Sequence, residues 1–380
     1  MGNKMGNMKM RKHNKENGFT LLELMVSMAV GLIVMAAMAS LFKMGLNSTM
    51  LVTQRAETQQ NMRAAIDLMV KDISMAGAGL PSGGIQLPTG GGATVAKFGC
   101  DQGGICHVPT STYPAGNYMY GIIPGYTNGV EGSAVIPAAP APAINDSITV
   151  IYCDYNFPLW EYNVTFPTGP TGTQINLTPN SSYTPAPPAP NASGGIQQGD
   201  LILINGTNGV TAVGEATGVS ATSITFANLD PLNMNWSGAT HTNNVYSVSG
   251  GAGYAFPLPA PGNQTQGTAY RLYAVTYYIT VPAAGQTPRL MRQVNGLNPV
   301  PVADNIINLQ FAFDTYNSTT SALDANQANP LGVGESPNLI QKVNLVVMGQ
   351  SMYNNGNKAQ NMYLATSISA RNMAFRNSYQ

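Results

Sequence analysis

The feature that most constrains this chain is residues 19–42, a long apolar run with a single charged side chain, Glu23. As an α-helix with a rise of ~1.5 Å per residue, this run would measure ~36 Å. The hydrocarbon core of a bilayer is ~30 Å thick, so the run is long enough to cross it with some tilt. The sequence therefore predicts one membrane-spanning helix close to the N-terminus.

The charges on the two sides of this run are unequal. Basic side chains crowd the N-terminal side, against Glu16 alone, at Lys4, Lys9, Arg11, Lys12 and Lys15. On the other side, Lys43 is the only basic residue before Arg55. Because Lys and Arg concentrate on the cytoplasmic side of a membrane helix, we expect the N-terminus in the cytoplasm. The chain after Phe42 should then lie on the outer side of the membrane.

The small residue Gly18 stands before the apolar run, whereas a secretory signal is cut after its apolar core. Cleavage at Gly18 would therefore leave the membrane anchor attached to the mature protein. Residues 17–24, Asn-Gly-Phe-Thr-Leu-Leu-Glu-Leu, resemble the cleavage and methylation motif of type IV prepilins. The resemblance implies that residues 1–18 are a leader, which a prepilin peptidase removes before it methylates the amine of Phe19.

The resemblance implies a specific role for Glu23. A carboxylate in hydrocarbon is unfavourable unless it has a partner. Cleavage would give Phe19 a cationic α-amino group one helical turn from Glu23. In pilins the matching Glu is thought to meet the amine of a neighbouring subunit, so the resemblance implies an ion pair that sets the register of assembly. The alternative is an ordinary membrane anchor in which Glu23 lies among the lipid headgroups.

The helical pattern continues past the membrane run to about Met75. An apolar stripe recurs at helical spacing, formed by Met62, Ile66, Met69 and Ile73. Gly77 and Pro81 then supply the signals that end a helix. We expect residues 19–42 to pack among lipids or sister helices, and residues 43–76 to pack on the protein's own domain.

The remaining residues, 77–380, have the composition of an exported β-rich domain. Charged residues make up 9% of the chain, the net charge is zero, and Gly (41) and Pro (26) are abundant. Between residues 81 and 270 the only Lys or Arg is Lys97, so nucleic acid is not an expected partner. Three proline-rich stretches, 136–142, 185–190 and 256–261, should be loops that join strands.

Enrichment in β-branched and aromatic residues predicts strands at 147–152, 200–204, 223–226, 270–281, 289–294, 306–313, 339–348 and 363–371. The segments 270–281 and 289–294 should form a hairpin. The predicted fold class is α+β and pilin-like, with a long N-terminal helix whose first half is transmembrane. This helix should pack on an antiparallel β-sheet that carries a large β-rich loop insertion.

The chain has three cysteines in what should be an oxidising compartment. Cys100 and Cys106 bracket a glycine-containing loop, which favours a disulfide between them and leaves Cys153 as a small buried residue in a predicted strand. A disulfide from Cys153 to either of the others stays open. A zinc site formed by Cys100, Cys106 and His107 lacks a fourth ligand at a usual spacing.

No pattern in the chain indicates catalysis. It holds three histidines, and no zinc-protease, phosphate-loop or nucleophile-elbow motif accompanies them. The polar residues Asp314, Asn317, Asp324 and Asn326 do not have EF-hand spacing, so we interpret them as a solvated loop. We expect a protein that is not an enzyme and needs no cofactor or metal.

Four C-terminal segments resemble the PilW family of minor pilins. In that family a strand ending in Arg is followed by a turn, a Val-Asp-Asn-Ile strand and a closing strand before Arg-Asn. The matching segments here are 290–296, 301–311, 341–348 and 370–373, within residues 268–380. Residues 81–267 have no counterpart in this resemblance and are interpreted as an insertion. Major pilins usually close a C-terminal loop with two cysteines, which this chain lacks.

The two resemblances together imply a minor pilin in the priming or tip complex of a type IV pilus. Its expected partners are the prepilin peptidase, the inner membrane before assembly, and other major and minor pilins through the N-terminal helix. One alternative is a pseudopilin of a type II secretion system. Another is an adhesin at the pilus tip, for which the uncharged middle of the chain is the only indication.

Overall fold

The computed structural model describes residues 18–81, 83–88, 96–109, 117–131, 145–167, 173–206, 211–235, 245, 267–282, 286–330, 332–351 and 360–373. Two units emerge from the contacts within the chain, Met1–Thr53 and Gln54–Gln380. The predicted leader up to residue 17 and the proline-rich stretches 136–142 and 256–261 lie outside the described residues. The stretch 185–190 is described and contains no strand or helix, as expected.

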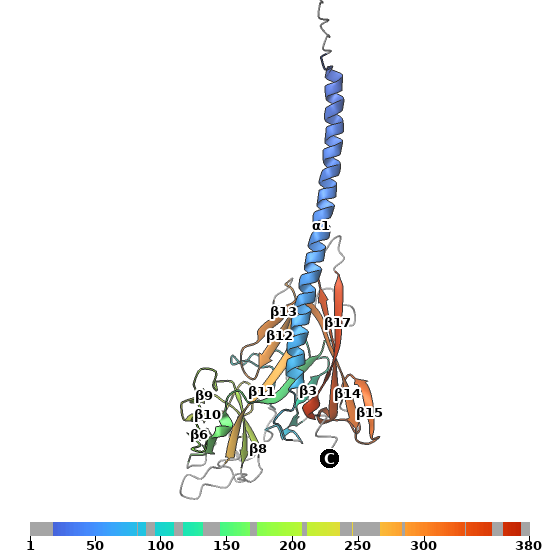
Figure 1. Cartoon of the computed structure of the whole chain (residues 1–380). Helices are drawn as coiled ribbons and strands as arrows, with labels where there is room; N and C mark the ends of the chain where they lie inside the picture. The colour runs from blue at the N-terminus through green and yellow to red at the C-terminus, as the bar shows by residue number, and fades with distance from the viewer. Residues whose placement is uncertain are drawn as a thin grey trace, which may run out of the picture. The chain divides into compact units, whose positions relative to one another are not determined.

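Helix α1 is a single element of 54 residues, Leu21–Ser74, as predicted from the sequence (Figure 1). Its residues are mostly Met, Leu, Ala and other good helix formers, and it contains no proline. The helix ends where Gly77 takes a positive φ of 77° and its amide donates to the carbonyl of Ile151, at 2.9 Å. A side chain at Gly77 would also collide with Met373, so this turn requires glycine.

The second half of α1 is amphipathic, and the predicted apolar stripe is confirmed. Its buried residues are Thr58, Met62, Ala65, Ile66, Met69, Asp72 and Ile73. The charged residues Arg63, Asp67 and Lys71 are all exposed on another face. The stripe is what attaches this part of the helix to the β-sheets.

The largest sheet has eleven strands and is antiparallel throughout its pairings. Its centre is β11 (Gly267–Thr280), which pairs with β4 (Ser147–Asp154) along residues 271–277. Two further strands pair with successive parts of β11, first β7 (Leu201–Gly206) and then β12 (Arg289–Val294). The β11–β12 pairing is the hairpin expected from the sequence.

The other strands of this sheet pair with these four strands or with one another. They are β3 (Ile122–Gly125), β5 (Tyr162–Thr165), β6 (Gln174–Pro179), β8 (Thr211–Glu215), β9 (Gly218–Val219), β10 (Ser223–Thr225) and β13 (Val300–Asp304). A separate two-stranded sheet pairs β1 (Ile85–Gln86) with β2 (Tyr118–Met119). Most of these strands belong to the β-rich region before β11.

A second antiparallel sheet has four strands in the order β15-β14-β16-β17. Their bounds are Ala322–Gln327 for β15, Ile306–Asn317 for β14, Ile340–Gln350 for β16 and Asn361–Ser369 for β17. Every strand predicted from the sequence overlaps a strand of one of these two sheets.

The main core lies between the second half of α1 and both sheets. Met62, Met69 and Ile73 of the helix belong to one buried cluster with Tyr277 of β11 and Leu345 of β16. Two smaller clusters lie within the β-rich region. The architecture is the predicted pilin-like α+β fold, a long N-terminal helix packed against antiparallel sheets with additional β-rich regions.

Candidate functional site

The candidate site is the start of α1 together with the exposed apolar surface that follows it. Gly18, Phe19 and Thr20 precede the first helical residue, Leu21, and all three are exposed. The side chain of Phe19 is 84% exposed. The peptide bond between Gly18 and Phe19 is therefore in non-helical, accessible chain, as proteolysis requires.

Thr20 and Glu23 form a capping box at this helix start. The hydroxyl of Thr20 accepts the amide of Glu23 at 3.3 Å, and one carboxylate oxygen of Glu23, Oε2, accepts the amide of Thr20 at 3.0 Å. The Thr20 hydroxyl also lies 3.0 Å from the same oxygen. These bonds satisfy backbone amides that a helix N-terminus leaves without partners. Sequence reasoning missed the role of Thr20, although the Thr-X-X-Glu spacing is a known signal for it.

The predicted ion pair between Glu23 and the amine of Phe19 stays a prediction. In the uncleaved chain the nitrogen of Phe19 is part of a peptide bond and carries no charge. The capping box nevertheless holds the Glu23 carboxylate beside the start of the helix. The cationic α-amino group that cleavage would form at Phe19 would lie next to that carboxylate.

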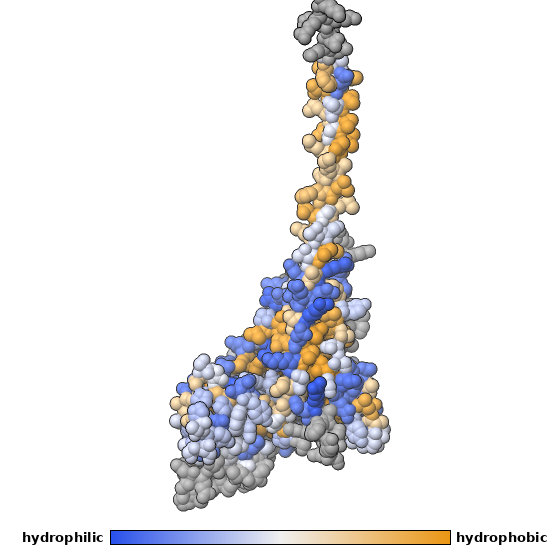
Figure 2. Space-filling model, in the orientation of Figure 1, coloured by the Kyte–Doolittle hydropathy of each residue, from blue (hydrophilic) through white to orange (hydrophobic). Residues whose placement is uncertain are grey.

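The first half of α1 presents apolar side chains to solvent all round. Figure 2 shows this segment as mostly orange and tan, interrupted by small white and blue patches. The exposed large residues run from Phe19 through Met38, Leu41 and Phe42 to Val52. The helix contains a segment long and apolar enough to cross a membrane, and none of that segment is buried. An apolar surface of this extent needs lipid or other helices to cover it.

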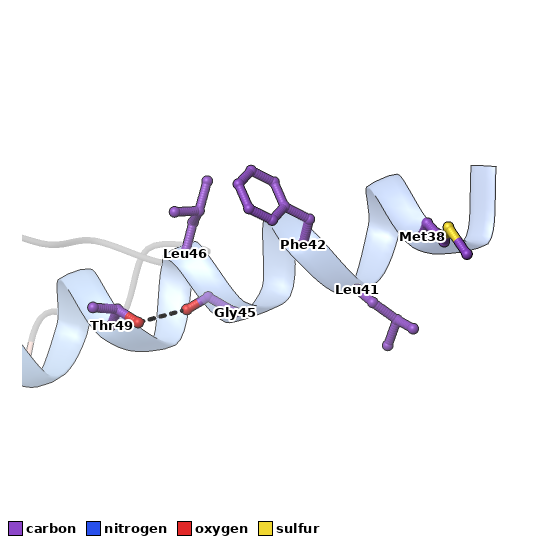
Figure 3. A pocket seen from close by; sticks show the side chains of 6 residues that line it. All are labelled: Met38, Leu41, Phe42, Gly45, Leu46 and Thr49. Carbon is purple, nitrogen blue, oxygen red and sulfur yellow. Dashed lines mark hydrogen bonds between the residues drawn. The ribbon is translucent and has the colours of Figure 1, made fainter. Parts of the chain in front are cut away.

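A shallow groove lies on this surface, lined by Met38, Leu41, Phe42, Gly45, Leu46 and Thr49. Figure 3 shows Phe42 and Leu46 projecting beside Gly45, and the Thr49 hydroxyl donating to the Gly45 carbonyl at 3.0 Å. Apart from Gly45 itself, its two chain neighbours and the adjacent helix backbone, no heavy atom lies within 4 Å of the position a Cβ would take at Gly45. Small residues flanked by larger ones let a second apolar helix approach closely.

One buried carboxylate, Asp72, attaches the other half of α1 to the large sheet. It accepts hydrogen bonds from the hydroxyls of Tyr277 at 2.6 Å and Tyr152 at 3.1 Å, and from Nε of Arg292 at 2.8 Å. Burial alone would lower the pKa of Arg292, but the hydrogen bond and charge of Asp72 raise it above its ordinary value. Sequence reasoning did not identify Asp72 or Arg292, because nothing local marks their pairing.

The structure joins Cys100 and Cys106 by a disulfide. Cys153 takes no part in this bond and is buried in β4. His107 contacts two carboxylates rather than a cysteine, with Glu131 at 2.6 Å from Nδ1 and Asp101 at 3.3 Å from Nε2. Burial would lower the pKa of His107, but Glu131 and then Asp101 outweigh it and raise the pKa. Among the described residues, no group of three or more His, Cys, Asp and Glu is arranged to hold a metal.

Asp314, which belongs to the polar C-terminal group, has several protein partners. It accepts the amide of Asn326 at 3.0 Å and Nδ2 of Asn344 at 2.9 Å, and it lies 3.3 Å from Nζ of Lys342. Asn317 donates to Asp324 at 2.8 Å, separately from Asp314. The four residues lie on β14 and β15, and Asp314 and Asn317 are buried, so the interpretation as a solvated loop was wrong.

A family model described as the prokaryotic N-terminal methylation motif matches residues 13–39. Comparison with curated proteins and with solved structures finds no match for the chain. The matched segment contains the Gly18-Phe19 bond, the Thr20–Glu23 capping box and most of the exposed apolar helix. The chain therefore carries a prepilin-type N-terminal methylation motif at the start of a pilin-like α+β fold.

Proposed function

We propose that this chain is a minor pilin of a type IV pilus, acting in the priming or tip complex. It is cut after Gly18, methylated on Phe19 and inserted into the fibre through the first half of α1. Before assembly, this half anchors the protein in the inner membrane with the leader in the cytoplasm. The proposal depends on one observation, the exposed apolar helix that begins directly after Gly18, Phe19 and the Thr20–Glu23 box.

The assembly role of Glu23 follows from the chemistry of that helix start. Removal of the leader would free a cationic amine at Phe19 in apolar surroundings, where it needs an anionic partner. Glu23 carries the one negative charge of residues 19–42. In a bundle of such helices, each Glu23 would attract the Phe19 amine of a neighbour and fix the axial register between subunits.

A minor rather than a major role is supported by the C-terminal resemblance to the PilW family. The segment 290–296 of that resemblance contains β12 and the turn after it, in which Asn295 has a positive φ of 51°. Within this segment, Arg292 binds Asp72 of α1. The residues that resemble PilW therefore include one that attaches the helix to the sheet, as expected for a motif that maintains the fold.

The proposal is tested by the mature N-terminus. Mass spectrometry of the protein from cells with active prepilin peptidase should find N-methylated Phe19 as the first residue. The same protein from peptidase-deficient cells should retain the leader before Phe19, with or without Met1. Unprocessed protein in both strains would contradict the proposal.

Deletion of the gene distinguishes a pilus from the related secretion machinery. A minor pilin predicts loss of surface fibres and of twitching motility or adhesion. Loss of enzyme secretion with normal fibres would instead identify a pseudopilin of a type II secretion system. The two machines share processing and fold, so only this functional readout separates them.

A further inference from the structure

Strand β17 (Asn361–Ser369) is the last strand of the four-stranded sheet (Figure 1). It pairs with β16 in nine consecutive residue pairs, from Gln350–Asn361 to Lys342–Ser369, with no register shift. Within the part of the chain that the structure describes, no strand pairs with its other edge. This edge is therefore long and regular.

Two hydrogen bonds that flank the strand show which backbone groups point to the outer edge. The amide of Ser351 donates to the carbonyl of Gln360, and the amide of Ala370 donates to the carbonyl of Gln341, both at 2.9 Å. Residues of an antiparallel strand alternate between facing their partner and facing away. Even-numbered residues of β17 thus bond to β16, and odd-numbered residues direct their N–H and C=O groups outward, namely Asn361, Tyr363, Ala365, Ser367 and Ser369.

The sequence of β17 lacks the features that normally protect an edge strand. Its residues are Asn-Met-Tyr-Leu-Ala-Thr-Ser-Ile-Ser, with no charge and no proline. Other described edges are protected: β13 contains Pro301 and Asp304, β3 contains Pro124, and β15 contains Asp324 and a register shift against β14. The edge strand β8 is largely buried. Proteins use such charges, prolines and bulges, and also very short edge strands such as β1, β2 and β9, to prevent unwanted strand addition. The nine-residue strand β17 has none of these features.

The side chains of β17 divide between the core and the solvent. Ile368 is buried and Met362 and Leu364 pack partly against the main core, which fixes the strand in place. On the other face Tyr363 is 72% exposed and lies opposite Met348, while Ala365 lies opposite Val346. A strand added at the edge would continue this face of the sheet and could cover the ring of Tyr363.

We propose that the outer edge of β17 binds an extended, uncharged strand of a neighbouring subunit and so enlarges the four-stranded sheet. A row of alternating N–H and C=O groups is complementary to the backbone of another extended chain. Because β17 has no charged residue, its edge favours a neutral partner strand and cannot form ion pairs with a charged surface. That the partner is a pilus subunit rests on the proposed function.

The decisive variant is Ala365→Pro, with Ala365→Ser as its matched control. Proline removes the outward N–H of residue 365 without removing a bond to β16, which is the one setting in which strands tolerate proline. Serine changes the same exposed position but retains the N–H. We expect Ala365→Pro to reduce co-purification with the other pilus subunits by about tenfold or more, as loss of ladder bonds would require. The Ala365→Ser variant should behave like the wild type.

Photo-cross-linking identifies the occupant of the edge. A benzoylphenylalanine in place of Tyr363, in the full chain in living cells, should cross-link to one extended segment of another pilus subunit, mapped by mass spectrometry. A cross-link to a second copy of this chain, to lipid or to no protein would overturn the proposal. Equal co-purification of the proline and serine variants would also overturn it. N-methylation of Phe19 is measured in the same samples, so a failure of processing is distinguished from a failure of strand addition.

Discussion

At the scale of single residues, Glu23 has two separable roles, a cap for α1 and a charge for assembly. A glutamine at this position of a capping box retains the cap but has no charge. We therefore expect Glu23→Gln and Glu23→Ala both to reduce incorporation into fibres by about tenfold or more, because each leaves the Phe19 amine of a neighbour without its partner. Immunoblots of sheared fibres against whole-cell protein measure this fraction.

The two variants also test the explanation itself. If capping were the whole contribution of Glu23, the glutamine variant would enter fibres like the wild type and only the alanine variant would fail. Thr20→Val provides the converse control, because it removes the hydroxyl of the capping box and retains the charge. Normal incorporation of all three variants would reject the ion pair and the cap together.

Another residue-scale effect concerns Glu215 and Asp230, two buried carboxyl groups in the β-rich region. Asp230 accepts the amides of Met234 at 2.8 Å and Asn235 at 2.7 Å, and Glu215 accepts the amide of Leu232 at 3.0 Å. Burial raises the pKa of Asp230. Burial, and then the neighbouring Asp230, raise the pKa of Glu215 to about 10. The folded protein therefore retains a proton that the unfolded chain releases above its ordinary pKa of 4.5.

This raised pKa predicts how stability changes with pH. The stabilisation is fully present below pH 4.5 and decreases as the pH rises towards 10, because the folded state binds more protons across this interval. The slope is at most ~1.4 kcal/mol per pH unit for one proton. Urea unfolding of the full chain in detergent, between pH 6 and 9, should show a falling midpoint. His107 contributes in the same direction, because its pKa is raised as well.

Glu215→Gln is the matched variant for this effect. The amide can donate a hydrogen bond to Asp230 at every pH, so the urea midpoint should depend less on pH than in the wild type. An unchanged slope would show that Glu215 titrates normally in the folded protein.

At the scale of elements, the contact that deserves a direct test is the attachment of α1 to β11 and β12 through Asp72. Replacing Asp72 with Ala leaves the Arg292 guanidinium and two tyrosine hydroxyls without their acceptor in a mostly buried site. Loss of one partner from such a pair costs ~3 kcal/mol of unfolding free energy. Asp67→Ala, at an exposed position of the same helix, is the control and should be nearly neutral. Equal urea midpoints for the two variants would show that the Asp72 contacts do not stabilise the fold.

The elements also show which parts of the fold the sequence could predict. The helix and the longer strands were predictable because their apolar residues repeat with a clear period over many positions. Strands such as β1, β2 and β9 have two residues each, too few for any period, and form through pairing with distant segments. β13 contains Pro301, and β15 has no β-branched or aromatic residue, so neither resembles a strand locally.

The candidate site likewise has a part that the sequence could predict and contacts that it could not. The motif around Gly18 and Glu23 is contiguous, so it could be found in the sequence alone. The partners of Asp72 are 80, 205 and 220 positions away, at Tyr152, Tyr277 and Arg292. No local pattern can indicate such contacts, and only the fold brings them together. The unpaired edge of β17 could not be predicted for a similar reason, since a strand's sequence does not reveal whether both of its edges are paired.

At the scale of the whole molecule, two kinds of surface are separated along the chain. The large apolar residues from Phe19 to Val52 are almost all exposed, whereas the helix residues of the main core begin at Met62. The two contact units divide at the same place, between Thr53 and Gln54. The unit up to Thr53 therefore needs a membrane or sister helices to cover it, whereas the unit from Gln54 contains the stable core.

This separation predicts that a fragment of residues 54–380 is soluble without detergent and folds cooperatively. It lacks the exposed apolar half of α1 but retains Met62, Met69 and Ile73, which belong to the main core together with residues of both sheets. A fragment of residues 75–380 is the matched control, because it lacks those side chains and would expose the core surface that they cover. Gel filtration should give a monomer for the longer fragment and aggregates for the shorter one. Near-ultraviolet circular dichroism should show fixed aromatic packing in the longer fragment alone, since Tyr277 contacts Asp72 of the helix. Aggregation of both fragments would mean that the domain depends on the membrane half of α1 for its fold, and good solubility of both would mean that the helix stripe is dispensable.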